Sequence, residues 1–280
     1  MANIPSFSLP NGEHIAVLGQ GTWQMAMSRA RRADEIKALQ AGIDLGMTLI
    51  DTAEMYGSGD AEELLAEAIA GRRDEVFLVS KVLPENSSRN GTIKACERSL
   101  KRLRTGTLDL YLLHWRGSFP LSETVDAFET LVKAGKIRSW GVSNFDVEDM
   151  QELMALPGGK ACAINQVLFN LSRRGIEQGL IPWSRKHNIP IMAYSPVEQG
   201  RLLGEPALRK VAERLNATPA QVALAWVLAH PDICAIPKAG RVEHVRENHA
   251  ALSLRLTKED MAALDAAFPP PGRPMPLEML

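Results

Sequence analysis

Short apolar runs rich in β-branched residues recur along the chain, and each is followed by a segment with helical spacing of its apolar positions. Several runs, such as VFLVS at 76–80 and LDLYLL at 108–113, are almost uniformly apolar. Strands covered on both faces of a parallel sheet have this pattern. Eight strands are therefore predicted, at Val17–Gly19, Thr48–Asp51, Val76–Lys81, Leu108–His114, Ile137–Ser143, Ala161–Gln166, Ile189–Tyr194 and Ile233–Pro237.

The intervening segments carry helix start signals. Thr218-Pro219-Ala220-Gln221 matches a capping box with proline at the first helical position. Asp60 and Ser122 are further candidate N-caps. Strand and helix thus alternate through the whole chain.

This alternation indicates the fold class. An open doubly wound sheet shows the same order of elements, but eight units in 280 residues favour an α/β fold of the (β/α)8 TIM barrel type. Without a linker or composition break, residues 1–280 are expected to form a single domain. Pro10-Asn11-Gly12 predicts a hairpin that closes the barrel floor. The proline-rich end, 268–280, predicts either a loop packed over the barrel or a mobile tail.

Composition excludes several classes of protein. The net charge is −1 and the pI is about 6.6, so nothing attracts nucleic acid or an anionic membrane in bulk. Cys96, Cys162 and Cys234 are isolated, which suggests neither a disulfide framework nor a zinc ribbon. The N-terminal residues show no basic region followed by an apolar run. We expect a cytoplasmic protein with reduced thiols.

Polar residues follow the predicted strands at the edge where barrel enzymes work. Asp51, Lys81 and His114 end three successive strands, and Tyr56 lies one short loop after Asp51. Taken singly, Asp51 could end a strand, Lys81 could be a solvated lysine, His114 a core histidine and Tyr56 a packed aromatic. Together they place a carboxylate, a cation, an imidazole and a phenol around one space.

Sequence motifs around these residues then point to a family. The chain resembles the aldo-keto reductases over nearly its whole length, and within them a bacterial branch that includes methylglyoxal reductases. The motifs occur in family order, as GQGTW (19–23), LIDTAEMYG (49–57), LVSKV (78–82), LDLYLLHW (108–115), GKIRSWGVSNF (135–145), INQV (164–167), AYSP (193–196), TPAQVALAW (218–226) and AIPKA (235–239).

The resemblance implies that Asp51, Tyr56, Lys81 and His114 are the catalytic tetrad and that NADP(H) lies extended across the barrel mouth. No G-x-G-x-x-G follows a strand, as expected without a Rossmann domain. The predicted activity is NADPH-dependent reduction of a carbonyl, with Tyr56 as the acid and His114 orienting the substrate oxygen. Asp51 would hold Lys81, and the Lys81 ammonium is expected to lower the pKa of Tyr56.

The resemblance also implies the cofactor contacts. Ser143, Asn144 and Gln166 would hold the nicotinamide carboxamide and Tyr194 would stack on the ring, although a strand-to-helix cap and a core tyrosine are the structural alternatives. The full predicted set is Gly21, Thr22, Trp23, Asp51, Ser143, Asn144, Gln166, Tyr194, Ser195, Pro196, Val197, Ile236, Pro237, Lys238, Ala239, Arg241, His244 and Asn248.

The chain departs from the family pattern in the segment that should bind the 2′-phosphate of the cofactor. Lys238 is expected to meet the phosphate, but Ala239 stands where many members have Ser or Thr, and His244 stands where many have Arg. Arg241 is a nearby cation. A titratable ring then replaces a permanent charge, so we expect a weaker preference for NADPH over NADH that rises at low pH.

The predicted substrate pocket combines Trp23, Tyr56, His114 and Trp115, with core packing as the alternative for the two tryptophans. The loop at 115–120 and the C-terminal tail are short. An open aromatic pocket favours small reactive carbonyls such as methylglyoxal or aromatic aldehydes.

Two other functions are compatible with parts of this pattern. Some barrels of the family serve as nucleotide-sensing partners with little turnover, and they keep the tetrad. A metal-dependent hydrolase would need paired ligands at strand ends, where only His114 qualifies, so no metal is expected. A monomer is the default expectation, since many relatives are monomers.

Overall fold

The barrel closes through hydrogen bonds between its first and last strands. The structure, a computed structural model, describes residues 4–280. Its eight parallel strands follow one another in sequence order from β3 to β10. Parallel bridges join Leu18 to Ala235 and Gly21 to Lys238, which link the two edges of the sheet. The predicted (β/α)8 barrel is therefore confirmed.

The strands of the barrel are β3 (Gln20–Gly21), β4 (Leu49–Asp51), β5 (Phe77–Val82), β6 (Leu108–Leu113), β7 (Ile137–Ser143), β8 (Cys162–Leu168), β9 (Ile191–Tyr194) and β10 (Ile233–Ala235). The helices are α1 (Arg32–Asp44), α2 (Asp60–Ala68), α3 (Arg89–Leu103), α4 (Leu121–Lys133), α5 (Val147–Ala155), α6 (Leu180–His187), α7 (Pro206–Arg214), α8 (Pro219–Leu228), α9 (Val242–Ala250) and α10 (Lys258–Ala267).

The helix starts differ in how well the sequence predicted them. The capping box at Thr218 is confirmed, because its side chain accepts from Gln221 N and the Gln221 side chain accepts in return. Ser122 is wrong as a cap. Helix α4 begins one residue earlier, after Pro120. Asp60 is the first residue of α2, and the cap itself is Gly59 in the left-handed region at φ 102°.

The first strand lies later than expected. Val17 and Gly19 exchange backbone hydrogen bonds with Ala235 of β10, and the strand paired with β4 is Gln20–Gly21. The other seven predicted strands overlap the observed ones, with ends that differ by at most two residues.

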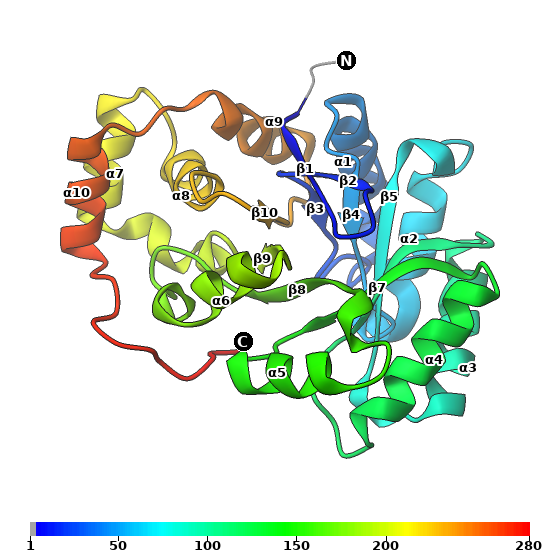
Figure 1. Cartoon of the computed structure of the whole chain (residues 1–280). Coiled ribbons are helices and arrows are strands. Elements are labelled where there is room, and N and C mark those ends of the chain that lie inside the picture. Colours follow the sequence, from blue (N-terminus) through cyan, green and yellow to red (C-terminus); the bar gives the residue numbers. More distant parts are fainter. Residues whose placement is uncertain (1–3) are drawn as a thin grey trace.

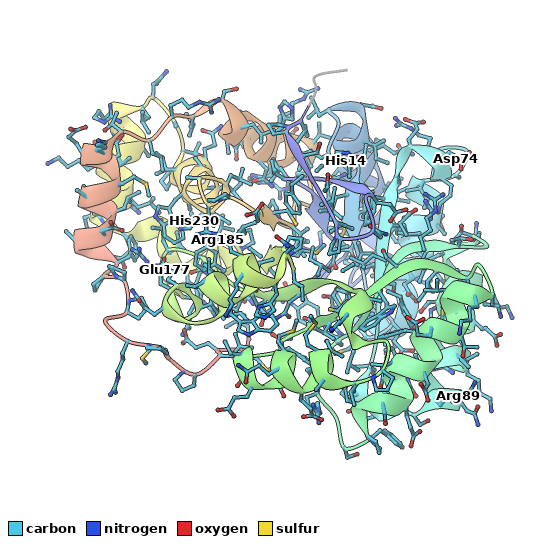
Figure 2. All side chains as sticks on the ribbon, viewed as in Figure 1. His14, Asp74, Arg89, Glu177, Arg185 and His230 are labelled. Carbon is cyan, nitrogen blue, oxygen red and sulfur yellow. The ribbon has the colours of Figure 1, made fainter. Side chains whose placement is uncertain are left out.

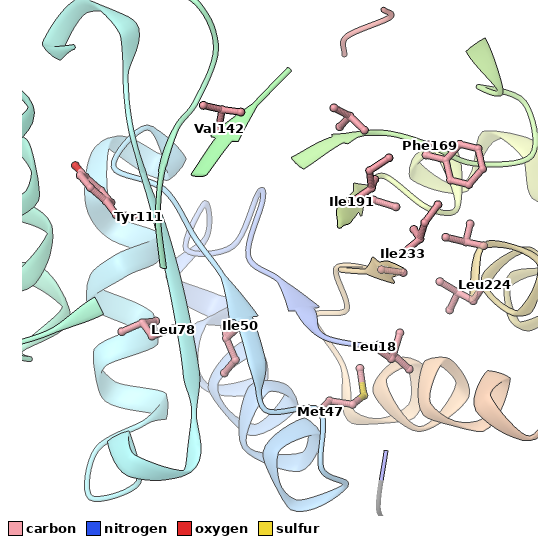
Figure 3. Close-up of a cluster of buried hydrophobic side chains, with 14 of the residues drawn as sticks. Leu18, Met47, Ile50, Leu78, Tyr111, Val142, Phe169, Ile191, Leu224 and Ile233 are labelled. Atoms are coloured by element: carbon pink, nitrogen blue, oxygen red, sulfur yellow. The ribbon is translucent and has the colours of Figure 1, made fainter. Parts of the chain in front are cut away.

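Apolar side chains fill two separate layers. Inside the barrel, residues such as Leu49, Val79, Leu112 and Ile164 form one cluster. Outside it, side chains such as Ile50, Leu78 and Tyr111 face the surrounding helices and join a larger cluster (Figure 3). Alternating strand residues therefore serve the two layers in turn, which explains the almost uniformly apolar runs.

The N-terminal hairpin covers one end of the barrel (Figure 1). Strands β1 (Ser6–Ser8) and β2 (His14–Ala16) are antiparallel, and Gly12 in the turn has φ 87°. Leu9 and Ile15 pack into the inner cluster. The predicted hairpin at the floor is thus confirmed, and the floor is closed by apolar side chains.

The proline-rich end packs against the barrel, so the packed-loop alternative holds. Glu278 forms an ion pair with Arg173 at 2.7 Å, and Leu277 contacts the outer core cluster. The segment runs from α10 to end near α5 and α6 (Figure 1). The backbone of Leu280 lies close to the Tyr194 side chain, so this segment reaches the barrel mouth.

Charged side chains lie mainly on the outside of the helical layer, as Asp74 and Arg89 do (Figure 2). Among residues 4–280, every helix is too short or too polar to cross a membrane.

Candidate active site

The four predicted catalytic residues meet at the C-terminal edge of the barrel. Asp51 ends β4, Lys81 lies near the end of β5 and His114 directly follows β6. Tyr56 opens the short 3-10 helix η2 (Tyr56–Gly59) after β4. All four side chains are buried, and Lys81 is fully so. The structure therefore brings together every member of the set.

Lys81 is the centre of the hydrogen-bond network. Its Nζ donates to Asp51 Oδ2 at 2.7 Å, to the carbonyl of Thr52 at 2.9 Å and to the Tyr56 hydroxyl at 3.1 Å. The other oxygen of Asp51 accepts from Gln166 Nε2 at 2.7 Å. Because an ammonium has three protons to donate, this set of partners fully satisfies Lys81.

Burial works against both charges of this ion pair. It raises the pKa of Asp51 and lowers the pKa of Lys81, while their mutual attraction acts in the opposite sense on each. The pair is nevertheless held by charge-assisted hydrogen bonds in a site without solvent contact.

The expected lowering of the pKa of Tyr56 is wrong. Burial, followed by the negative charge of Asp51, raises the pKa of the Tyr56 phenol well above 10. The charge of Lys81 is already engaged by Asp51 and does not offset the burial. Tyr56 is consequently protonated at neutral pH, which is the form that an acid requires.

His114 is held as a neutral ring. Burial and the positive charge of Lys81 lower the pKa of His114 from 6.5 to about 2. Its Nδ1 atom is buried without a hydrogen-bond partner in the part of the chain that the structure describes. Asn144 Nδ2 donates to the backbone carbonyl of His114 at 3.0 Å and fixes the strand end. A neutral imidazole can donate one hydrogen bond without carrying a charge.

Aromatic rings surround the tetrad. The ring centroids of Trp23 and Tyr56 are 5.1 Å apart, those of Tyr56 and His114 are 5.8 Å apart, and those of His114 and Trp115 are 4.7 Å apart. Trp23 remains 42% exposed. The four residues predicted to line the pocket thus form one continuous wall.

The predicted nicotinamide contacts also lie together. Ser143 Oγ donates to the carbonyl of Gln166 at 2.8 Å, and Asn144 Nδ2 donates to Ser143 Oγ at 3.2 Å. The Tyr194 hydroxyl donates to Asn144 Oδ1 at 3.0 Å. Asn144 has φ 59°, in the region that asparagine tolerates better than most residues. Amide and hydroxyl groups therefore line one side of the mouth, as a carboxamide requires.

The remaining predicted cofactor contacts lie along the same C-terminal edge of the barrel, in the direction of α9. A Cβ on Gly21 would lie 2.7 Å from the carbonyl oxygen of Ile236, so only glycine fits this approach. Asn248 is buried, whereas Arg241 and His244 are exposed. His244 Nδ1 lies 3.2 Å from Glu247 Oε2. The others lie at or just beyond the ends of β3, β9 and β10, and are Thr22, Ser195, Pro196, Val197, Pro237 and Ala239.

Lys238 is available to bind an anion. Within residues 4–280 no carboxylate lies within 4.0 Å of its ammonium. Burial lowers its pKa, the charge of Glu35 raises it and that of Arg31 lowers it. The sequence analysis identified neither Glu35 nor Arg31 as a neighbour of Lys238. Glu35 stands three and four residues before the core residues Ala38 and Leu39, and this spacing already places it on the buried face of α1.

A separate cavity of about 120 Å³ lies away from the tetrad, at the start of β9 and β10. Ser184 and Arg185 line it, and Arg185 is labelled in Figure 2. None of the predicted site residues contributes to this cavity, so it supports no part of the chemistry described above.

The depressed pKa of His114 predicts a loss of stability in mild acid. Below pH 6.5 the unfolded chain binds a proton at the His114 ring, whereas the folded chain does not. The contribution of His114 to the free energy of unfolding is therefore full above pH 6.5 and decreases as the pH falls below this value. The expected loss is about 1.4 kcal/mol per pH unit below this pH. We expect His114→Gln to show a flatter fall in unfolding free energy between pH 6.5 and 4.5 in urea titrations.

The exposed His14, changed to Gln, is the control and should follow the unmodified protein. Parallel curves for His114→Gln and the unmodified protein would contradict the burial of a neutral His114.

Comparison with known proteins agrees with this geometry. A model of the Aldo/keto reductase family matches residues 17–268. Methylglyoxal reductase YeaE of Escherichia coli (strain K12) is 51% identical over 271 residues, which cover 95% of each chain. Glyoxal reductase of Bacillus subtilis (strain 168) is 34% identical over 258 residues, covering 92% of this chain and 91% of the relative.

Solved structures show the same fold. An aldo/keto reductase from Klebsiella pneumoniae in complex with NADP and acetate has a TM-score of 0.96 and 49% identity, covering 99% of this chain and 100% of the other. An aldo-keto reductase from the same organism in complex with NADPH has a TM-score of 0.97 with the same identity and coverage. The site geometry, the family match and these relatives lead to one conclusion: the chain belongs to the aldo/keto reductase family.

Proposed function

We propose that the protein reduces small aldehydes and ketones to alcohols with NADPH, using Tyr56 as the proton donor. One observation carries the proposal: the Tyr56 hydroxyl lies 3.1 Å from Lys81 Nζ, itself ion-paired with Asp51, beside a neutral His114. The proposal is supported by relatives named methylglyoxal reductase and glyoxal reductase.

Each member of the tetrad has a distinct task in this reaction. Bound NADPH supplies a hydride to the carbonyl carbon. Tyr56 gives its proton to the carbonyl oxygen as negative charge develops there, and Lys81 stabilises the phenolate left behind. His114 donates a hydrogen bond to the same oxygen. Asp51 keeps Lys81 in place, so the groups are oriented before the substrate arrives.

The residues at the mouth fit a nicotinamide nucleotide. Ser143, Asn144 and Gln166 offer donors and acceptors to a carboxamide, and Tyr194 offers a ring for stacking. At the other end, the unpaired Lys238 would bind the 2′-phosphate, with Arg241 and His244 on the adjacent start of α9. Together these residues support binding of NADP(H) along the edge from Tyr194 to Asn248.

Removing one hydroxyl group tests the proposed acid. Tyr56→Phe keeps the ring and should lower kcat by roughly 10²- to 10⁴-fold while NADPH still binds, as measured by NADPH absorbance and by fluorescence titration. Tyr111→Phe is the matched control, because it removes a buried hydroxyl that has no hydrogen-bond partner. Equal activity in Tyr56→Phe and the unmodified protein would refute the assignment. NADPH binding without turnover of any aldehyde would favour the nucleotide-sensing alternative.

The replacement of the usual arginine by His244 predicts a pH-dependent preference. An imidazole gains its charge only as the pH falls, so the preference for NADPH over NADH should rise at low pH. In His244→Arg the charge is permanent, so this rise should be lost, and the pH dependence that remains is that of the 2′-phosphate itself. Dissociation constants from fluorescence titration measure this, and a pH-independent NADPH affinity in the unmodified protein removes His244 from the phosphate site.

The expected substrates are small reactive carbonyls. The wall of Trp23, Tyr56, His114 and Trp115 is aromatic, and the short loop at 115–120 adds little depth. We expect kcat/KM for methylglyoxal and aromatic aldehydes to exceed that for a steroid ketone in an NADPH absorbance assay. A steroid reduced more efficiently than methylglyoxal would show that the pocket is larger than we infer.

The cytoplasmic location, the monomeric state and the organisation of residues 1–280 as one domain stay predictions.

A further inference from the structure

A buried carboxylate lies next to the lysine that we assign to the 2′-phosphate. Glu35, in the first turn of α1, is only 1% exposed. Its Oε2 accepts a hydrogen bond from the backbone N–H of Ala26 at 2.9 Å, which fixes the side chain. Its Oε1 is buried and has no hydrogen-bond partner among residues 4–280. A buried oxygen in this state is unusual and calls for an explanation.

Gly240 shows how close the carboxylate is to Lys238. A Cβ on Gly240 would lie 3.6 Å from Lys238 Nζ and 3.8 Å from Glu35 Oε1. The two groups therefore face the same side of the loop that follows β10. They do not form an ion pair within 4.0 Å in the described part of the chain, so the ammonium stays free to meet another anion.

We propose that Glu35 sets the cofactor specificity, by weakening the binding of NADPH relative to NADH. The inference rests on the proposed binding of the 2′-phosphate at Lys238. A phosphate there shares the ammonium with the buried Glu35 carboxylate, and the two anions repel each other. The 2′-hydroxyl of NADH carries no charge and escapes this repulsion.

Other charges at the site do not cancel the effect. Arg31 and Arg241 are exposed to solvent, where screening reduces their influence. His244 is exposed and lies against Glu247, and Ala239 offers no hydroxyl. Glu35 is thus the one buried charge among the groups named around Lys238.

Neutralising the carboxylate is the direct test. Glu35→Gln has the same shape and can still accept from Ala26 N–H. Titrations of tryptophan fluorescence should show NADPH binding about tenfold tighter and NADH changing by less than about threefold. Glu243→Gln, the same change at an exposed position in α9, is the matched control and should alter neither constant.

A second variant separates the charge from the hydrogen bond. Glu35→Ala also removes the charge, so it should bind NADPH more tightly than the unmodified protein does. This variant also loses the hydrogen bond that Glu35 accepts from the Ala26 N–H, in the same loop as Trp23. Because Trp23 lines the predicted substrate pocket, Glu35→Ala should raise KM for the carbonyl more than it changes kcat. Thermal unfolding confirms that both variants are folded.

Equal changes for NADPH and NADH, or weaker NADPH binding in both variants, would overturn the role of Glu35. If the unmodified protein binds neither cofactor, the proposed function fails, and the inference fails with it. That failure is recognisable because no titration of the unmodified protein saturates.

Discussion

The buried ion pair between Lys81 and Asp51 is the interaction on which the site depends. Removing two such charges from water costs several kcal/mol per ion, and here burial opposes the charged form of both groups. The pair is therefore poor evidence of stabilisation. What it provides is position: one ammonium holds the end of β4, the Thr52 carbonyl and the Tyr56 hydroxyl, and Asp51 extends the contact to Gln166 of β8.

Positioning by this pair makes the raised pKa of Tyr56 understandable. Because Asp51 lies beside the ammonium and burial disfavours the phenolate, the attraction of Lys81 does not bring the pKa of the phenol below its ordinary value. The phenol instead stays protonated and close to the ammonium, where a phenolate, once formed, finds its counter-charge at 3.1 Å. Lys81 thereby lessens the free-energy cost of the phenolate that the proposed proton transfer would leave behind.

The sequence predicted the location of the site better than its electrostatics. Asp51, Lys81 and His114 were found because parallel strands in a barrel end at one face, so their position along the chain sets their position in space. The pKa of Tyr56 was misjudged because its direction depends on burial and on which partner Lys81 prefers, and neither follows from the order of residues. Glu35 was missed although its helical spacing placed it on the buried face. Ser122 failed as a cap because the N-cap is Pro120, two residues earlier, and the helix begins at Leu121.

The path of the C-terminal segment has a practical consequence for handling the protein. Leu280 reaches Tyr194 at the open end of the barrel, while the hairpin β1–β2 covers the opposite end. Any polypeptide attached after Leu280, such as a purification tag, would emerge beside the residues that we predict to bind nicotinamide. A tag placed before the hairpin would emerge on the far side of the molecule, where it leaves the approach of cofactor and substrate clear.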